Sequence, residues 1–532
     1  MSVRERLGRS AEERPPLPLL ALSGVIAAVV VFPLGWLLVM AAGIDPDTAW
    51  ELTTSEGARE VLVNSIYLMV GVTVGSILLG VPLAYLTVRT NLPFRRFWTI
   101  VVALPLVIPS YVGAFTAVSA FGPRGEFQNA LAPLGVEEIP EIYGLPGAIL
   151  VITLYTYPYV YLTTRAALLT VDARLIDAAR TLNHGRLSAF WRVTLPQIRP
   201  AIGAGALLAA LYAISDFGTP SIMRLPVFTR EIYREFNISG LTEAAVLSLQ
   251  LLALVVVVLV LERWISKGGT ESEGETGRGR PVRLGRWRWP AMAFPAAVAS
   301  LALVVPLWIL FQWLTSPGTT RRQDLAFEWA MASNSVQISF AAAVIAALAA
   351  IPIGYLSAHH DSRLGDLFER GTYLGFAVPG VVLGLALVYF GTRLVPWAYQ
   401  ALPLLIFGYV VRFLPEAVGN VRSTSLQVDS RLVEAARTLG DSPLRAFRRV
   451  TLPQILPGIV AGGALVFLTT MKELPITLMI KPTEFETIAT QIWRAQDAAY
   501  YQYAAMPAFI LMVISGLSMV VLLLSGSGDR DL

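Results

Sequence analysis

Two carboxylates stand near the ends of long apolar stretches, where charge is costly and marks a functional candidate by default. Asp216 and Glu473 are equivalent, each 16 residues after the proline that opens its stretch. At helical rise this is ~24 Å, near the far mouth of a ~30 Å hydrocarbon layer. Facing each other, they would attract a hard cation through oxygen ligands. Alternatively, Lys472 neutralises Glu473, and each stretch simply ends in a polar residue.

Arg412 and Glu416 lie four residues apart in another apolar stretch. This spacing predicts an i,i+4 ion pair buried between helices. The residues at the equivalent positions of an internal repeat are Tyr155 and Tyr159, so we expect the two halves to line a pathway differently. The phenol oxygens could touch a metal cargo, although aromatic packing explains most such tyrosines.

The sequence has no motif typical of a bound metal, a cofactor or ATPase activity. There is no cysteine, and the adjacent His359 and His360 are better explained as a solvated helix end than as ligands, so we assign no metal site. A P-loop requires a lysine directly after a glycine, and none of the three lysines follows one. We therefore expect no bound cofactor and no ATPase activity in this chain.

The composition indicates a polytopic membrane protein. The 532 residues are 55% hydrophobic and 15% charged, whereas a soluble domain is about a quarter charged. The missing charge implies extensive contact with lipid. The net charge of +4 is not read as nucleic-acid binding, because basic residues in such proteins mostly set orientation.

Apolar length and flanking charge predict twelve spans in an all-α membrane protein. They lie near residues 17–42, 61–88, 98–121, 146–168, 200–222, 243–264, 290–314, 335–358, 371–392, 399–421, 457–480 and 500–525. With the N-terminus inside, the inner segments carry 29 Lys and Arg and the outer ones 10. The positive-inside rule then places both termini in the cytoplasm. We expect the chain to lie in the inner (cytoplasmic) membrane of the cell.

The chain repeats itself. Residues 171–200 and 428–457 are identical at 20 of 30 positions, and Asn64-Ser65 recurs as Asn334-Ser335. We expect a first six-span repeat at 1–264, a flexible Gly/Ser/Glu-rich linker at 265–289 and a second repeat at 290–532. Six spans per repeat make the repeats parallel, with a pathway at their interface.

The best-matched part of the repeat is a pair of expected cytoplasmic loops, at 171–200 and 428–457. Each pattern predicts a short helix, a left-handed stop at Asn183 or Gly440, and a second short helix. Ser442-Pro443 suits an N-cap followed by the first helical residue. Pro196 and Pro453 should end the second helix. Loops this similar in both halves indicate that both meet the same kind of partner.

This arrangement resembles the E-A-A-x₃-G-x₉-I-x-L-P loop of permease subunits in binding-protein-dependent ABC importers of the type I fold. The second copy matches at Glu434, Ala435, Ala436, Gly440, Leu452 and Pro453, with valine for isoleucine. The first copy has Asp177, Ala178, Ala179, Asn183, Leu195 and Pro196 at these positions. The resemblance implies that each loop forms a coupling helix on a separate ATPase subunit. Two copies of that subunit would bind the ATP.

The fused, twelve-span form resembles the iron(III) importer family, with fused thiamine permeases as relatives. The resemblance implies a cargo of ferric iron, and thiamine, a polyamine or an oxyanion remain alternatives. Residues 226–233 and 486–493 should lie outside, where a solute-binding protein would dock. A rival of another class is a secondary transporter driven by an ion gradient, for which matched cytoplasmic loops would serve no purpose. A membrane protein without transport is a further rival.

Overall fold

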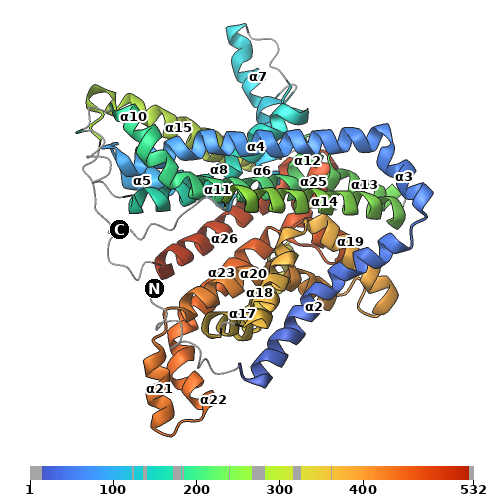
Figure 1. Cartoon of the computed structure of the whole chain (residues 1–532). Helices are drawn as coiled ribbons and strands as arrows, with labels where there is room; N and C mark the ends of the chain where they lie inside the picture. Colours follow the sequence, from blue (N-terminus) through green and yellow to red (C-terminus); the bar gives the residue numbers. More distant parts are fainter. Residues whose placement is uncertain are drawn as a thin grey trace. The chain divides into compact units, whose positions relative to one another are not determined.

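The computed structural model consists of helices (Figure 1). It describes residues 15–122, 125–135, 141–171, 181, 185–238, 240–266, 282–315, 325–360 and 362–526. Within these ranges there is no β-strand, only an isolated bridge between Thr90 and Val282. The all-α fold expected from the sequence is confirmed for this part of the chain.

The helices group into two compact units. The first-repeat unit comprises Asp45–Gln323 and Ala495–Met512, and the second-repeat unit comprises Met1–Ile44, Asp324–Arg494 and Val513–Leu532. These units are not the sequence repeats, because the first helix of each repeat packs in the other unit. Helix α2 (Leu17–Ala42) lies against α18 and α19 of the second-repeat unit, and α16 (Val305–Thr315) lies against α6 of the first.

The first-repeat unit is built on three long helices, α4 (Glu56–Arg89), α8 (Gly144–Thr170) and α11 (Leu195–Ser215), which pack against one another. The remaining elements used below are α6 (Ser110–Phe121), α12 (Gly218–Ile222), α13 (Phe228–Ile238) and α14 (Leu241–Ser266).

The second-repeat unit has matching elements in the same order. Helices α17 (Trp329–His359), α20 (Leu402–Ser425) and α23 (Leu452–Met471) pack together as α4, α8 and α11 do. The others are α18 (Arg363–Ala377), α19 (Gly380–Leu394), α21 (Ser430–Thr438), α22 (Pro443–Ala446), α24 (Pro475–Ile480) and most of α25 (Ile488–Asp497). Helix α26 (Gln502–Gly526) is divided between the two units after Met512.

Glycine lets the long helices approach closely. A Cβ on Gly205 of α11 would lie 2.6 Å from the Cα of Val160 in α8, and one on Gly462 of α23 would lie 2.9 Å from the Cα of Ala417 in α20. These glycines and their partners are equivalent in the two repeats, which identifies one shared helix contact.

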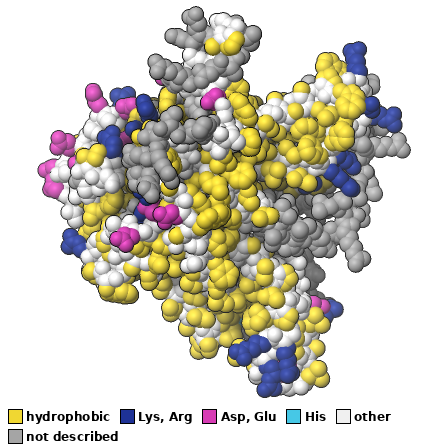
Figure 2. Space-filling model, turned by 180° about the vertical axis from the view of Figure 1, so that it is seen from behind, with side chains coloured by type: hydrophobic (Ala, Val, Ile, Leu, Met, Phe, Trp, Pro, Cys, Tyr) yellow, Lys and Arg dark blue, Asp and Glu magenta, His cyan; other side chains and the backbone are white. Residues whose placement is uncertain are grey.

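The outer helix faces are apolar. Figure 2 shows one face of the molecule that is mostly hydrophobic, with Lys and Arg gathered in separate clusters. In the second-repeat unit, α17 exposes Phe340 (63%) and Leu348 (61%). A soluble protein rarely leaves so large an apolar surface uncovered, so this surface is suited to lipid.

All twelve predicted spans fall on helices of the described residues, but four of them are not continuous. In the described part of the chain, nine helices are long and apolar enough to cross a membrane, or up to eleven if each of two bent helix pairs counts as one span. The third and ninth predicted spans bend by 96° and 103°, at Pro109 and Pro379. The fifth and eleventh end at Ser215 and Met471, and a separate short helix follows each. Proline removes a backbone donor, which permits the helix pairs to bend at Pro109 and Pro379.

The bounds predicted for the linker, 265–289, differ from the structure at both ends. Helix α14 continues to Ser266. Val282 donates its backbone N–H to the carbonyl of Arg89 at 2.7 Å, and the N–H of Leu284 bonds the side chain of Asn91 at 2.8 Å. The apolar side chain of Leu284 packs on a cluster around Trp98, so this end of the segment can bury surface. Residues 267–281 lie outside the described part.

Candidate functional site

The segment 428–457 forms two short helices joined by a tight turn. Asp429 caps α21, its carboxylate accepting from the N–H of Arg431 at 3.0 Å. At the other end Gly440 has φ +94°. Its N–H bonds the carbonyl of Arg437 at 3.0 Å, and the N–H of Asp441 bonds that of Ala436 at 3.1 Å. This is a Schellman ending, so the left-handed stop predicted at Gly440 is confirmed.

The second short helix begins as predicted, with Ser442 at the N-cap and Pro443 at the first helical position. Asp441, in the turn, is held by Arg449 at 3.3 Å and by Arg445 at 3.7 Å. Figure 1 shows α21 and α22 as a projection beyond the start of α23. The turn is thus fixed on both sides and presents a defined surface.

That surface combines apolar and charged groups. Glu434, Ala435 and Gly440 are exposed and Ala436 is half-buried. Leu439 is 88% exposed and Leu444 61%. Two leucines held out on a rigid turn, beside arginines, are typical of a surface that binds another macromolecule.

The proline that follows α22 does not end a helix, which corrects the expectation for Pro196 and Pro453. A π-turn at Phe447–Thr451 leads directly into Leu452 and Pro453 at the start of α23, and Phe190–Thr194 does the same before Leu195 and Pro196. Proline lacks an N–H, and the π-helical segment directly before it is the kind of local irregularity by which a continuous helix accommodates the missing bond. The short helix is therefore joined to the long one, with Pro200 and Pro457 inside the long helices.

The first loop can be followed only in part. Asp177, Ala178, Ala179 and Asn183 lie outside the described residues. Leu195 is half-buried and Pro196 is exposed.

Asp216 stands at a helix break, not within a span as predicted. It follows Ser215, the last residue of α11, and precedes α12. Its Oδ1 accepts from the hydroxyl of Ser110 at 2.9 Å, and that hydroxyl accepts from Tyr212 at 3.1 Å. Its backbone carbonyl accepts from Thr229 at 2.7 Å. The residue therefore joins α11, α6 and α13.

Glu473 occupies the equivalent break between α23 and α24 and is 6% exposed. Its carboxylate accepts from the N–H of Ile476 at 3.0 Å, and from the N–H and hydroxyl of Thr477 at 3.1 and 3.0 Å. Its charged neighbour is Arg412, not Lys472 as the alternative interpretation supposed. Asp216 and Glu473 belong to different units, and their facing each other stays a prediction.

Glu416 lies one turn along α20 from Arg412 and accepts a hydrogen bond from Thr469 at 2.9 Å. It is attracted by Lys472 and, more weakly, by Arg412. Glu416 thus belongs to a wider set of charges between α20 and α23, and its direct ion pair with Arg412 stays a prediction.

The tyrosines of α8 use their hydroxyls within the first-repeat unit. Tyr155 donates to the carbonyl of Ala302 at 3.3 Å, and Tyr157 to that of Val102 at 2.7 Å. The ring of Tyr159 packs against Tyr212 with 6.3 Å between centroids. Such contacts are typical of structural tyrosines, and a place of Tyr155 and Tyr159 in the pathway stays a prediction.

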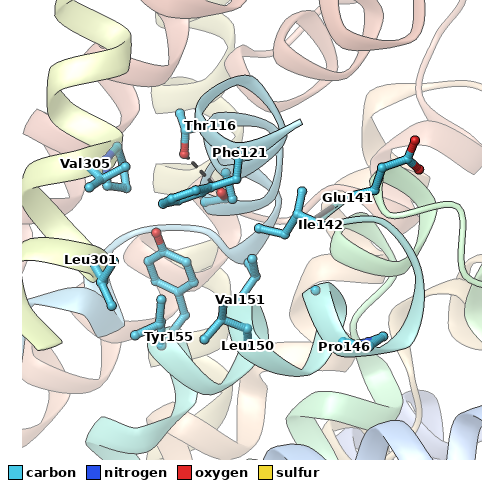
Figure 3. A pocket seen from close by; sticks show the side chains of 15 residues that line it. Thr116, Phe121, Glu141, Ile142, Pro146, Leu150, Val151, Tyr155, Leu301 and Val305 are labelled. Carbon is cyan, nitrogen blue, oxygen red and sulfur yellow. Dashed lines mark hydrogen bonds between the residues drawn. The ribbon is translucent and has the colours of Figure 1, made fainter. Parts of the chain in front are cut away.

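Tyr155 also lines a cavity of about 350 Å³ in this unit. Figure 3 shows its walls, which are mainly apolar and come from α6, α8 and the helix around Leu301. The hydroxyl of Thr116 is bonded to its own helix at the carbonyl of Gly113, 3.0 Å away. The cavity therefore presents a mainly apolar surface to a ligand.

The histidine pair is not a simple solvated end. His359 stacks on Tyr355, with centroids 4.5 Å apart, and Tyr355 meets Phe447. No group of three or more His, Cys, Asp or Glu residues that could hold a metal occurs in the described ranges.

A duplicated polar clamp was missed as a site, although its sequence signal was visible. The Asn64 amide donates to the carbonyl of Pro226 at 3.1 Å, and the Ser65 hydroxyl accepts from the N–H of Phe228 at 3.2 Å. Asn334 and Ser335 make the same bonds to Glu486 and Ile488, at 3.0 and 2.8 Å. The repeated Asn-Ser pair fixes the start of α13 in one unit and of α25 in the other.

The clamped helices are amphipathic and each buries a polar residue at the same place. Glu231 of α13 is 4% exposed and pairs with Arg234 at 2.8 Å and Arg230 at 3.0 Å. Burial raises the pKa of Glu231, and the two arginines lower it. In α25 the equivalent Gln491 donates to the carbonyl of Leu325 at 2.5 Å.

Removing the Ser335 hydroxyl tests the clamp. In Ser335→Ala the buried N–H of Ile488 loses its acceptor, which should lower the free energy of unfolding by about 1–3 kcal/mol. The melting transition of detergent-solubilised protein measures this. The exposed Ser333→Ala is the matched control, and equal melting of both variants would contradict the assignment.

Two matching sets of apolar helices define a membrane permease built from a tandem repeat. In each set, one helix pair is bent and a short helical segment continues into a long helix. Residues 76–268 and 350–525 match the family described as "Binding-protein-dependent transport system inner membrane component". The chain belongs to this family.

Individual relatives agree with this assignment. The chain is 30% identical to "Fe(3+)-transport system permease protein FbpB 2" of Haemophilus influenzae, over 96% of this chain and 98% of the relative. It is 22% identical to "Ferric transport system permease protein FbpB" of Actinobacillus pleuropneumoniae, over 85% of this chain and 69% of the relative. It is 30% identical to "Molybdenum transport system permease protein ModB" of Mycobacterium bovis, over 44% of this chain and 89% of the relative.

Proposed function

We propose that this chain forms the whole transmembrane pathway of an ATP-binding-cassette importer and takes its energy from a separate ATPase. The observation that carries the proposal is the exposed α21–α22 turn, which is continuous with the long helix α23. Two copies of the ATPase bind the loops at 171–200 and 428–457. Both loops and both termini then lie in the cytoplasm. The chain binds no cofactor, and the ATP stays on its partners.

Motion passes from the ATPase to the pathway through the helix connection. Because α22, the π-turn and α23 are joined without a loop, displacement of the turn moves α23 and the break at Glu473 at its other end. ATP binding opens the pathway outward to a solute-binding protein, and hydrolysis reopens it inward. Glu434 and Asp177 are the docking carboxylates. Asp216, Glu473, Arg412, Glu416, Tyr155 and Tyr159 are the pathway candidates.

The cargo we propose is iron(III). The support is the ferric transport permease of Haemophilus influenzae, similar over nearly all of both chains. The Asp216 carboxylate and the Ser110 hydroxyl are hard oxygen ligands of the kind that this ion prefers. The second candidate is an oxyanion, favoured by the likeness of 44% of the chain to a molybdenum permease.

The test reverses both docking charges. In Glu434→Lys with Asp177→Lys, the ATPase should no longer co-purify and uptake should fall at least tenfold, because two charged contacts become repulsive. Uptake of radiolabelled iron, molybdate and thiamine by a deletion strain carrying the wild-type chain identifies the cargo. Unchanged assembly and uptake in the double variant would refute the docking, and uptake without any ATPase would favour a secondary transporter.

A further inference from the structure

The equivalent carboxylates Asp216 and Glu473 meet the same element in their own units. Pro109 and Pro379 mark the bends of the outer helix pairs, and the residues directly after them are Ser110 and Gly380. The Ser110 hydroxyl lies 2.9 Å from Asp216 Oδ1. A Cβ on Gly380 would lie 3.1 Å from Glu473 Oε1. Each carboxylate thus sits against the first residue after a bend.

What holds the carboxylate differs between the units. In the second-repeat unit the Arg412 guanidinium fills the space in front of Gly380, so that Nη1 would collide with a Cβ there. This places a positive charge beside Glu473, which also receives three hydrogen bonds from α24. A buried charge is stable when hydrogen bonds and a nearby opposite charge offset its desolvation, and Glu473 has both.

Asp216 is surrounded by dipoles instead. The Ser110 hydroxyl donates a hydrogen bond to it, and the hydroxyl of Thr219 and the N–H groups of Gly218 and Thr219 lie close enough to favour its charged form. Among the described residues, no lysine or arginine is one of them. Its negative charge is therefore solvated by dipoles and not neutralised.

The position of the glycine next to the bend also differs between the two units. Arg412 is equivalent to Tyr155, 257 residues earlier, the offset of the matched loops. The Tyr155 ring packs against Gly113, one turn beyond Ser110, and the position equivalent to Gly113 is Leu383. Each unit has its glycine where the side chain from the neighbouring long helix arrives. Gly380 has no positive φ, so space and not backbone conformation requires it.

We propose that the two carboxylates have different roles in transport. Glu473 is a positioning residue, fixed by Arg412 in the space that Gly380 leaves, and it ties the break after α23 to the bend before α19. Asp216 is the specificity-determining residue, the uncompensated negative charge that meets a cationic cargo. The role given to Asp216 rests on the proposed transport function, whereas the role given to Glu473 does not.

The positioning part is tested without cargo, by melting of the detergent-solubilised full chain. Gly380→Ser should lower the transition clearly, because the new side chain collides with Arg412. Arg412→Ala should lower the transition less in the Gly380→Ser background than in wild type, because there it also relieves the collision and leaves the new hydroxyl near the carboxylate, as Ser110 is near Asp216 in the other unit. Gly380→Ala is the milder variant if serine prevents folding. The control is Gly371→Ser in α18, whose Cβ would meet only Val31 Cγ2 at 3.5 Å.

Additive losses in the double variant would overturn the Gly380–Arg412 pairing, since residues in contact should couple. Gly380→Ser that melts like wild type would overturn it as well.

The cargo part is tested by concentration-dependent iron uptake with the complete transporter. Asp216→Asn keeps an acceptor for Ser110 but removes the charge, so KM should rise about tenfold with unchanged melting. Glu473→Gln should lower the melting transition and the maximal rate and leave KM unchanged. The reverse pattern, or the same KM change in both, would overturn the division of roles. Absence of iron uptake by the wild type would refute the proposed cargo but not the pairing shown by melting.

Discussion

Leu439→Asp is expected to abolish co-purification of the ATPase with this permease. Leu439 follows α21 and is 88% exposed, on a turn whose backbone is fixed by the Schellman bonds at Gly440. Burying such a leucine at an interface stabilises it by about 1.5–3 kcal/mol. A carboxylate there loses this and adds a desolvation cost. We expect at least a 30-fold weaker complex, about 2 kcal/mol, the level of an interface hot spot.

Titration of the ATPase against detergent-solubilised permease measures the affinity. Leu439→Met is the matched control, because it keeps an apolar side chain of similar volume and should bind almost normally. The permease itself should melt as wild type in both variants, since Leu439 is largely exposed. Normal binding by Leu439→Asp would show that the exposed leucine is not part of the docking surface.

Gly205→Ala and Gly462→Ala should each destabilise the fold by about 1–3 kcal/mol. The added Cβ of residue 205 would lie 2.6 Å from Val160 Cα and 2.9 Å from the carbonyl oxygen of Tyr159. At residue 462 it would lie 2.9 Å from Ala417 Cα. Backbone atoms cannot rotate away as a side chain can, so the long helices must separate. A lower melting transition in detergent and a lower yield of folded protein are the measurements.

Neighbouring glycines supply the controls. A Cβ on Gly203 would meet nothing within 4 Å, and one on Gly463 would meet only Ala347 Cβ at 3.6 Å and the carbonyl oxygen of Ala343 at 3.8 Å. Gly203→Ala and Gly463→Ala should therefore be neutral or slightly stabilising, because alanine favours the helix by roughly 1 kcal/mol over glycine. If all four variants lose stability equally, the cause is not the close approach of the helices.

The tandem repeat explains why equivalent positions are informative. The Asn-Ser clamp and the Gly205/Gly462 contact occur in both units with the same partners, so duplication has kept their geometry. At the Asp216 and Glu473 positions both repeats have a carboxylate, but the neighbouring groups differ between the repeats. A difference inside an otherwise matched framework marks a place where the two halves do different work.

The sequence by itself determined the helical class, the twelve apolar segments, the repeat and the α21–α22 turn. These follow from local chemistry: apolar length matches a membrane, and Gly440 and Ser442-Pro443 act on the backbone within a few residues. The Asn-Ser repeat also carried the signal of the clamp, although its partners, some 150–160 residues away, were not visible in it.

Only the tertiary structure decided where the helices break and what the buried charges meet. A proline permits a bend, but packing decides whether the chain bends by 103°, as at Pro379, or continues as one helix, as at Pro352 within α17. Likewise, Arg412 was expected to pair with Glu416, four residues on. Its guanidinium also lies beside Glu473, because Gly380, distant in the sequence, leaves room for it. Whether two distant residues make contact depends on the space that the residues around them leave free. A local sequence pattern does not contain this information.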